Sequence, residues 1–179
     1  DVHVTSSHNV KRFGATGDAR KLTDAVITNG SGVITSATGA FSDVDVGKMI
    51  WGINSVGTVV LPVGTITAIN SPTSLTASTS GVGTWSGISL VLGTDDTAAL
   101  IAASKAADAA TPRGNITVPA GGFIFTQTPF TWTNSPYQFR RPSITGEGSS
   151  HTHFYPMPGA ELSNGCILNF DTINGTTNF

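Results

Sequence analysis

Two adjacent aspartates, Asp95 and Asp96, are the first residues of this chain that invite a chemical interpretation. Enzymes that cleave glycosidic bonds use a pair of carboxylates that face one another across the substrate. Adjacent residues on a helix point about 100° apart, so neighbours in sequence rarely converge on one bond. The alanine-rich run that follows predicts a helix over residues 95–110. We therefore expect Thr94 or Asp95 to serve as its N-cap and expect no catalytic residue within the chain.

A second group with chemical capacity is formed by His151 and His153, whose alternation would place both imidazoles on one side of a strand. Together with Glu147 they could chelate a metal ion, because imidazole and carboxylate are common metal ligands. The spacing matches no established metal site, and a polar turn is the favoured interpretation. We expect no metal and no cofactor.

Aromatic side chains offer a third kind of chemistry, since exposed rings stack on the faces of sugars. Trp51 lies within the apolar run KMIWGI and is predicted to belong to a core. Trp85, in GTWSG, and Trp132, in FTWTN, lie among glycine and polar residues and are candidate glycan contacts. Ordinary packing is the favoured alternative for both, because large aromatic residues dominate cores and interfaces.

The elements that must position these residues are mainly strands. Between residues 19 and 92, short β-branched runs recur at roughly ten-residue spacing between turn residues, which predicts a small all-β domain. After the helix, short strands are expected at intervals of roughly 20–25 residues, at 115–118, 123–125, 143–145 and 167–170. One helix followed by evenly spaced strands with glycine corners favours a solenoid whose open end the helix covers.

Composition excludes several classes of partner. Only 11% of the 179 residues are charged and the formal net charge is -2. The nine basic residues are scattered, which argues against a nucleic-acid surface. No apolar run approaches the roughly 18 residues that a membrane-spanning helix needs. The single cysteine, Cys166, excludes an internal disulfide.

Four motifs, in this order, resemble the opening of the pectate-lyase-like family of right-handed parallel β-helices. They are VKRFGATGD (10–18), GTDDTAALIAASKAA (93–107), GNITVPAGGFIFTQTPF (114–130) and PSITGEGSSHT (142–152). The family includes phage tailspikes and tail fibres as well as secreted polysaccharide-degrading enzymes. In its ordinary members the first motif runs almost directly into the second, whereas here residues 19–92 intervene. The string FSDVDVGKMIWG (41–52) in that segment is similar to small β modules inserted at this position in phage tail proteins.

The resemblance implies a mainly β fold, namely the start of a right-handed parallel β-helix with one N-terminal capping helix and an inserted small all-β domain. Residues 1–18 would form an extended N-terminal lead and the first β-helix segment, and residues 19–92 the inserted domain. Residues 93–179 would form the capping helix and the first β-helix turns. Catalytic acids of the family lie on later turns, so the resemblance transfers no catalytic residue to this chain.

The function implied is that of a phage virion protein, the N-terminal portion of a tailspike or tail fibre. Such a portion attaches and positions a host-glycan-binding or depolymerising body, and any lyase or glycosidase activity would lie beyond residue 179. The expected partners are two further copies in a homotrimer, other tail or baseplate proteins and host surface polysaccharide, without nucleic acid or membrane insertion. The expected location is extracellular, on the virion tail.

Two alternatives stay open. The chain could be the N-terminal portion of a secreted polysaccharide lyase or glycoside hydrolase. It could also act through a carbohydrate-binding module formed by the inserted β domain.

Overall fold

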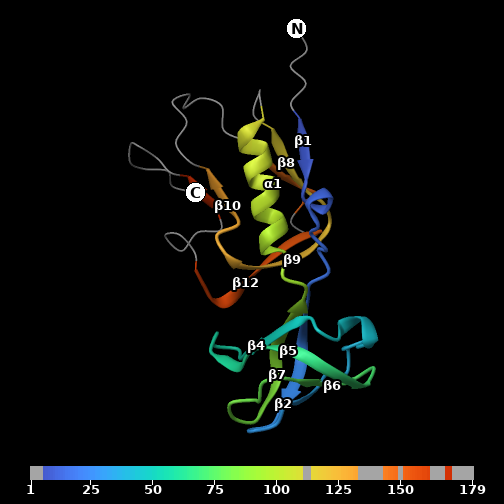
Figure 1. The fold of residues 1–179 in the computed structure, drawn as a ribbon. Helices are drawn as coiled ribbons and strands as arrows, with labels where there is room; N and C mark the ends of the chain where they lie inside the picture. Colours follow the sequence, from blue (N-terminus) through green and yellow to red (C-terminus); the bar gives the residue numbers. More distant parts are fainter. Residues whose placement is uncertain (1–5, 111–113, 133–142, 149–150, 162–167, 171–179) are drawn as a thin grey trace. The chain divides into compact units, whose positions relative to one another are not determined.

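The structure is a computed structural model that describes residues 6–110, 114–132, 143–148, 151–161 and 168–170 (Figure 1). The chain divides into two compact units. Unit 1 comprises Asp1–Gly17 and Asp96–Phe179, and unit 2 comprises Asp18–Asp95. Unit 2 therefore interrupts the sequence of unit 1 between Gly17 and Asp96.

Unit 2 is a closed antiparallel barrel of six strands, in the order β2-β3-β6-β5-β4-β7. Each pair of neighbouring strands is antiparallel. Because the sheet closes on itself, its strands leave no edge unpaired. The strands are β2 (Arg20–Ile27), β3 (Val33–Thr35), β4 (Met49–Ile53), β5 (Val59–Ser71), β6 (Ser74–Ala77) and β7 (Trp85–Gly93), and a 3-10 turn, η2 (Asp43–Asp45), lies between β3 and β4.

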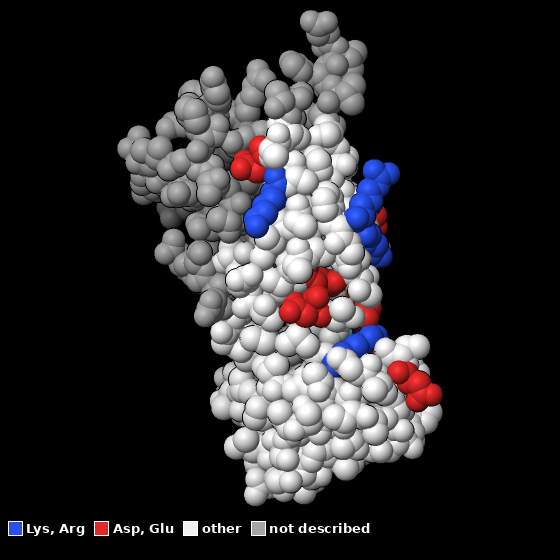
Figure 2. Space-filling model, viewed as in Figure 1, with Lys and Arg blue, Asp and Glu red and all other residues white. Residues whose placement is uncertain are grey.

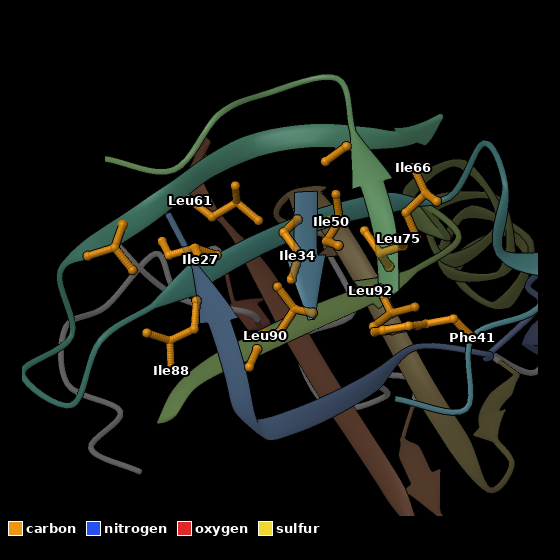
Figure 3. Close-up of a cluster of buried hydrophobic side chains, with 13 residues drawn as sticks. Ile27, Ile34, Phe41, Ile50, Leu61, Ile66, Leu75, Ile88, Leu90 and Leu92 are labelled. Atoms are coloured by element: carbon orange, nitrogen blue, oxygen red, sulfur yellow. The ribbon is translucent and has the colours of Figure 1, made fainter. Parts of the chain in front are cut away.

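Side-chain alternation fills the interior of this barrel. In β2, Ala25 and Ile27 are buried while Val26 between them is exposed, as the two-residue period of a strand requires. Gly52 shows how closely the interior is packed, because a Cβ atom there would lie 2.8 Å from Ile88 Cδ1. All six strands and one loop contribute to the core, whose members are Ala25, Ile27, Ile34, Phe41, Ile50, Val60, Leu61, Ile66, Leu75, Ala77, Ile88, Leu90 and Leu92 (Figure 3).

Irregular pairing bends the strands around this small core. The register shifts within the β2–β7, β4–β5 and β5–β6 pairs. Such bulges increase local twist and bend a strand, which a closed barrel requires of a strand as long as β5.

Unit 1 combines one α-helix with short parallel strands. The strands pair in three separate sheets, β1-β8-β11, β9-β12 and β10-β13, and every pairing is parallel. The helix packs against η1 and against β1, β8, β9 and β10. The elements are β1 (Ser7–Asn9), η1 (Val10–Phe13), α1 (Thr97–Ala109), β8 (Asn115–Val118), β9 (Gly121–Gln127), β10 (Phe130–Trp132), β11 (Ile144–Gly146), β12 (Thr152–Glu161) and β13 (Leu168–Phe170).

One face of α1 contributes to the hydrophobic core of unit 1. Leu100, Ala103 and Ala107 are fully buried and follow the three- and four-residue spacing that places side chains on one side of a helix. They belong to one cluster with Phe123 and Phe125 of β9. The helix predicted over 95–110 is confirmed, and its alanines let its backbone lie close to the strands. Within the described residues, no helix is long and apolar enough to cross a membrane.

The predicted right-handed parallel β-helix is wrong. The largest sheet is the closed antiparallel barrel, and the parallel pairs of the described residues form only sheets of two or three strands. The described residues form no solenoid that α1 could cap. The mainly β class with one helix does agree with the structure. The error arose because spacing alone does not distinguish turns of one solenoid from separate short sheets.

Candidate functional site

A shallow depression of about 430 Å³ lies on the barrel of unit 2. Asp24 and Val26 reach it from β2, where alternation places both on the outer side of the strand. Thr35 lies at the end of β3, paired with Val26, and Thr73 lies in the turn between β5 and β6. The complete lining is Asp24, Val26, Thr35, Ser36, Ala37 and Thr73.

The Asp24 carboxylate organises the loop that follows β3. Its Oδ1 accepts hydrogen bonds from Ser36 Oγ at 2.5 Å and from Thr38 Oγ1 at 2.9 Å. Its Oδ2 accepts from the backbone N–H of Thr38 at 2.9 Å. Ser36 is 2% exposed, and its own N–H donates to the carbonyl of Thr73. The floor of the depression is therefore held by hydrogen bonds from two sides.

These hydrogen bonds also determine the charge of the site. The hydroxyl of Ser36 and then the N–H of Thr38 stabilise the carboxylate form and lower the pKa of Asp24 below the ordinary value for an aspartate. Asp24 is consequently ionised at neutral pH. Among the described residues that line the depression, it is the only titratable one.

The same loop contains a strained residue. Ala40 adopts a φ of 45°, in the left-handed region that favours glycine, and it is the only non-glycine residue with positive φ among the described residues. Backbone strain of this kind is concentrated at functional sites. It therefore adds weight to the loop after β3 as part of a binding surface.

The chemistry of the depression suits binding of a polyhydroxylated ligand. The carboxylate accepts hydrogen bonds, hydroxyl groups such as that of Thr35 can donate or accept, and Val26 and Ala37 offer apolar surface. Glycoside hydrolysis needs a second carboxylate across the bond, and the lining has only one.

Trp85, one of the two tryptophans that the sequence offers as candidate glycan contacts with packing as the favoured alternative, is 42% exposed at the start of β7. Its Nε1–H donates to the carbonyl of Val82 at 2.9 Å, which fixes the orientation of the indole. Gly83 makes room for it, because a Cβ atom there would lie 2.6 Å from Trp85 Nε1. The Asn29 side chain accepts from the N–H of Gly83 at 3.0 Å and so ties this loop to the end of β2. Trp85 thus presents an aromatic ring of fixed orientation on the surface of unit 2.

The register of the barrel places Trp85 close to the depression along the backbone. Trp85 pairs with Ile27, the residue after Val26. Paired residues on adjacent strands are about 5 Å apart and consecutive Cα atoms 3.8 Å apart in a nearly perpendicular direction, so about 6 Å separates the Cα atoms of Trp85 and Val26. Cross-strand partners share a face of the sheet, so Trp85 follows the side of Ile27 and not that of Val26, and the two features are separate contact points on unit 2.

An ion-pair network holds the two ends of unit 2 together. Lys48 Nζ lies 2.9 Å from Asp18 Oδ2 and 3.0 Å from Asp45 Oδ1. Arg20 Nη2 lies 2.8 Å from Asp45 Oδ2. Asp18 also accepts from the N–H and the hydroxyl of Thr94, at 2.8 and 3.0 Å. We interpret the network as structural, because its positively charged side chains pair with its negatively charged ones.

Asp96, and not Thr94 or Asp95, is the N-cap of α1, so the predicted cap is wrong by one or two positions. The buried Asp96 carboxylate accepts from the N–H of Thr16 at 2.6 Å and from that of Gly17 at 3.2 Å. These two hydrogen bonds join the N-terminal segment of unit 1 to the start of α1. This use could not be read from the spacing, because the donors lie about eighty positions earlier.

The remaining candidates are not brought together within the described part of the chain. Trp51 is buried, as predicted. The backbone of Trp132 forms part of β10, but its side chain lies outside the described residues. The ring of His153 stacks on that of Tyr155 with 6.3 Å between centroids. Within the described part of the chain, no group of three His, Cys, Asp or Glu residues could hold a metal ion.

Sequence reasoning missed Asp24, the central residue of the depression. A signal was present, since aspartate is depleted in strands and Asp24 interrupts the β-branched run of β2. The partners Ser36 and Thr38 could not be inferred, because they become neighbours only through the β2–β3 pairing.

The motifs that resemble the pectate-lyase-like family do not assemble the fold expected of that family. The first motif ends at Asp18, which belongs to the barrel unit, and the second passes from β7 of unit 2 into α1 of unit 1. The identification as a tailspike or tail fibre of that superfamily is therefore wrong, and the fold lends no support to a phage tail. No protein-family model matches this chain, and no curated protein matches it in sequence.

Proposed function

We propose that the chain is a non-catalytic binding protein whose barrel, unit 2, is a carbohydrate-binding module. The observation that carries this proposal is the depression centred on Asp24, in which one ionised carboxylate and several hydroxyl groups lie beside apolar side chains. Carbohydrates require this combination, because a sugar ring presents hydroxyl groups at its rim and C–H groups on its faces.

Trp85 supports the proposal from the adjacent strand. Its exposed indole is a second surface of unit 2 on which a sugar ring can stack. The hydrogen bond from its Nε1–H to Val82 holds the ring in place before a ligand arrives. A side chain whose orientation is already fixed loses little conformational entropy when a ligand binds.

Much of the remaining barrel wall also suits an uncharged polymer. No Asp, Glu, Lys, Arg or His occurs between Met49 and Thr94, the segment that forms β4 to β7. On the face shown in Figure 2, the surface over β4, β5 and β6 is accordingly almost free of charged atoms. A polysaccharide lying across this wall would meet hydroxyl and apolar groups.

The partners expected from the sequence remain predictions. Association as a homotrimer and binding of a host surface polysaccharide are compatible with a binding module. Attachment to other tail or baseplate proteins, a location on the virion and the absence of a catalytic site in the chain are likewise untested.

Binding of the full chain to a panel of immobilised polysaccharides and a glycan array tests the proposal. We expect retention on at least one polysaccharide and about tenfold weaker binding by Trp85→Ala, equivalent to about 1.4 kcal/mol. Asp24→Ala should weaken binding to the same ligand. Val56→Ala is a matched control, because Val56 is an exposed apolar residue of unit 2 with 81% exposure.

Thermal unfolding of each variant separates loss of binding from loss of structure. The proposal is rejected if the folded native chain binds no glycan of the panel. It is equally rejected if the Trp85 and Asp24 variants bind as tightly as the Val56 variant.

A further inference from the structure

We propose that the depression centred on Asp24 selects sugars that carry a free amino group over neutral sugars, and neutral sugars over uronic or other acidic sugars. This inference rests on the proposed function and specifies which ligand charge the depression prefers. It follows from the electrostatics of unit 2.

Asp24 is the source of the selectivity because its charge is not compensated by another side chain. Among the described residues it forms hydrogen bonds with Ser36 and Thr38 but no ion pair. Its Oδ2 accepts one hydrogen bond in the structure, so it has capacity for a second donor. An ammonium group is the donor that benefits most from a carboxylate acceptor.

The basic residues of unit 2 do not neutralise the depression. Unit 2 contains three of them, against five aspartates. Arg20 and Lys48 are held in ion pairs with Asp45 and Asp18. Lys21 is exposed and forms no ion pair with Asp24. A sugar carboxylate in the depression would therefore meet a like charge and no cation.

The expected preference is modest because the site is open to solvent. An exposed ion pair contributes about 0.2–1 kcal/mol, which corresponds to a ratio of dissociation constants of about 1.4 to 5. Repulsion of an acidic sugar has the same order of magnitude. Salt screens such interactions, so the ratio should fall towards one in about 1 M salt.

Three soluble probes test this order with the full chain: a tetramer of glucosamine, its fully N-acetylated counterpart and a tetramer of galacturonic acid. Titrations are followed by Trp fluorescence or protein NMR at about pH 6, where an amine of the α-amino type is protonated. We expect the glucosamine tetramer to bind about 1.4- to fivefold more tightly than the acetylated one and the acidic tetramer to bind most weakly.

Two variants locate the effect in the depression. Asp24→Asn removes the charge and should bring the ratio between amino and acetylated probes to about one, whatever its effect on either affinity. Thr73→Lys places a cation in the lining and should reverse the order, with the acidic tetramer preferred. The matched control Asp43→Asn removes an exposed charge of η2 outside the lining and should keep the native order.

The outcomes distinguish this inference from the proposed function. If the native chain binds the probes with equal affinity, or if Asp24→Asn and Thr73→Lys both keep the native order, the selectivity is overturned and glycan binding stands. If neither these probes nor the polysaccharide panel bind, both proposals are overturned together.

Discussion

Replacement of Asp45 by asparagine tests the ion-pair network most directly. Asp45 is fully buried, and its carboxylate accepts from Arg20 Nη2 at 2.8 Å, Lys48 Nζ at 3.0 Å and the N–H of Ser42 at 3.2 Å. Asparagine keeps the shape and one acceptor oxygen but turns an amide group towards the two cations. We expect the free energy of unfolding of unit 2 to fall.

The size of that loss follows from the partners. A hydrogen bond to a charged group contributes about 1.5–3 kcal/mol, and removal of one member of a buried ion pair costs about 3–5 kcal/mol. Two features reduce the loss of stability. The Arg20 side chain is 36% exposed, so water can solvate it, and Lys48 retains its ion pair with Asp18, in which Nζ lies 2.9 Å from Oδ2. We expect a loss of about 2–4 kcal/mol, a large share of the 5–15 kcal/mol typical of a domain.

The contribution of Asp45 to the free energy of unfolding depends on pH, and the direction of its pKa shift gives the sign of that dependence. Burial alone would raise the pKa of Asp45, but hydrogen bonds from Lys48 and Ser42 and the charge of Arg20 outweigh it and hold the pKa below its ordinary value. A carboxyl group with a lowered folded-state pKa contributes stability above its unfolded-state pKa and loses it as the pH falls through the folded-state value. The native chain and the variant should therefore differ at neutral pH and converge in acid.

Urea unfolding followed by tryptophan fluorescence measures this difference, because Trp51 and Trp85 both belong to unit 2. Asp43→Asn, an exposed substitution in the same 3-10 turn, serves as the control and should change stability by at most about 0.5 kcal/mol. The reasoning is refuted if Asp45→Asn is no more destabilising than this control, or if the gap between native and variant chains is the same at every pH.

Three further predictions concern other features. Ala40→Gly should raise the free energy of unfolding by about 0.5–1 kcal/mol in urea titrations, because relief of the left-handed strain exceeds the entropic cost of glycine; a loss of stability would contradict this. Asp96→Asn should cost about 1–3 kcal/mol and speed hydrogen exchange at the amides of Thr16 and Gly17, and unchanged exchange would exclude the role given to Asp96. Native mass measurement should give three copies of the chain, and a monomer at all concentrations would end the trimer hypothesis.

The sequence supported the local features of the fold better than its architecture. The helix was predictable because an acidic start, an alanine-rich run and a following proline and glycine all agree. The strand-rich character of residues 19–92 was predictable from β-branched runs between turn residues. Closure of those strands into a barrel was not, because it depends on the pairing of β2 with β7, which lie far apart in sequence.

The residues of the candidate site also differ in how far the sequence could identify them. Trp85 could be singled out because glycine residues on both sides suggest a surface position. Asp24 acquires its importance only after folding, when the β2–β3 pairing brings Ser36 and Thr38 to its carboxylate. The burial of Asp96 depends likewise on the N–H groups of Thr16 and Gly17, which no local pattern connects to it.

The contact between Gly17 and Asp96 has a consequence for how the chain folds. These residues are 79 positions apart, yet they are hydrogen-bonded, while Asp18 and Thr94 are joined within the intervening barrel. A barrel that folds first would bring the two halves of unit 1 together and shorten the loop that unit 1 must close to a few residues. The saving in loop-closure entropy is about 3 kcal/mol. Unit 2 would thus act as a template for the folding of unit 1, and pulsed hydrogen exchange should show barrel amides protected before those of β8 and β9.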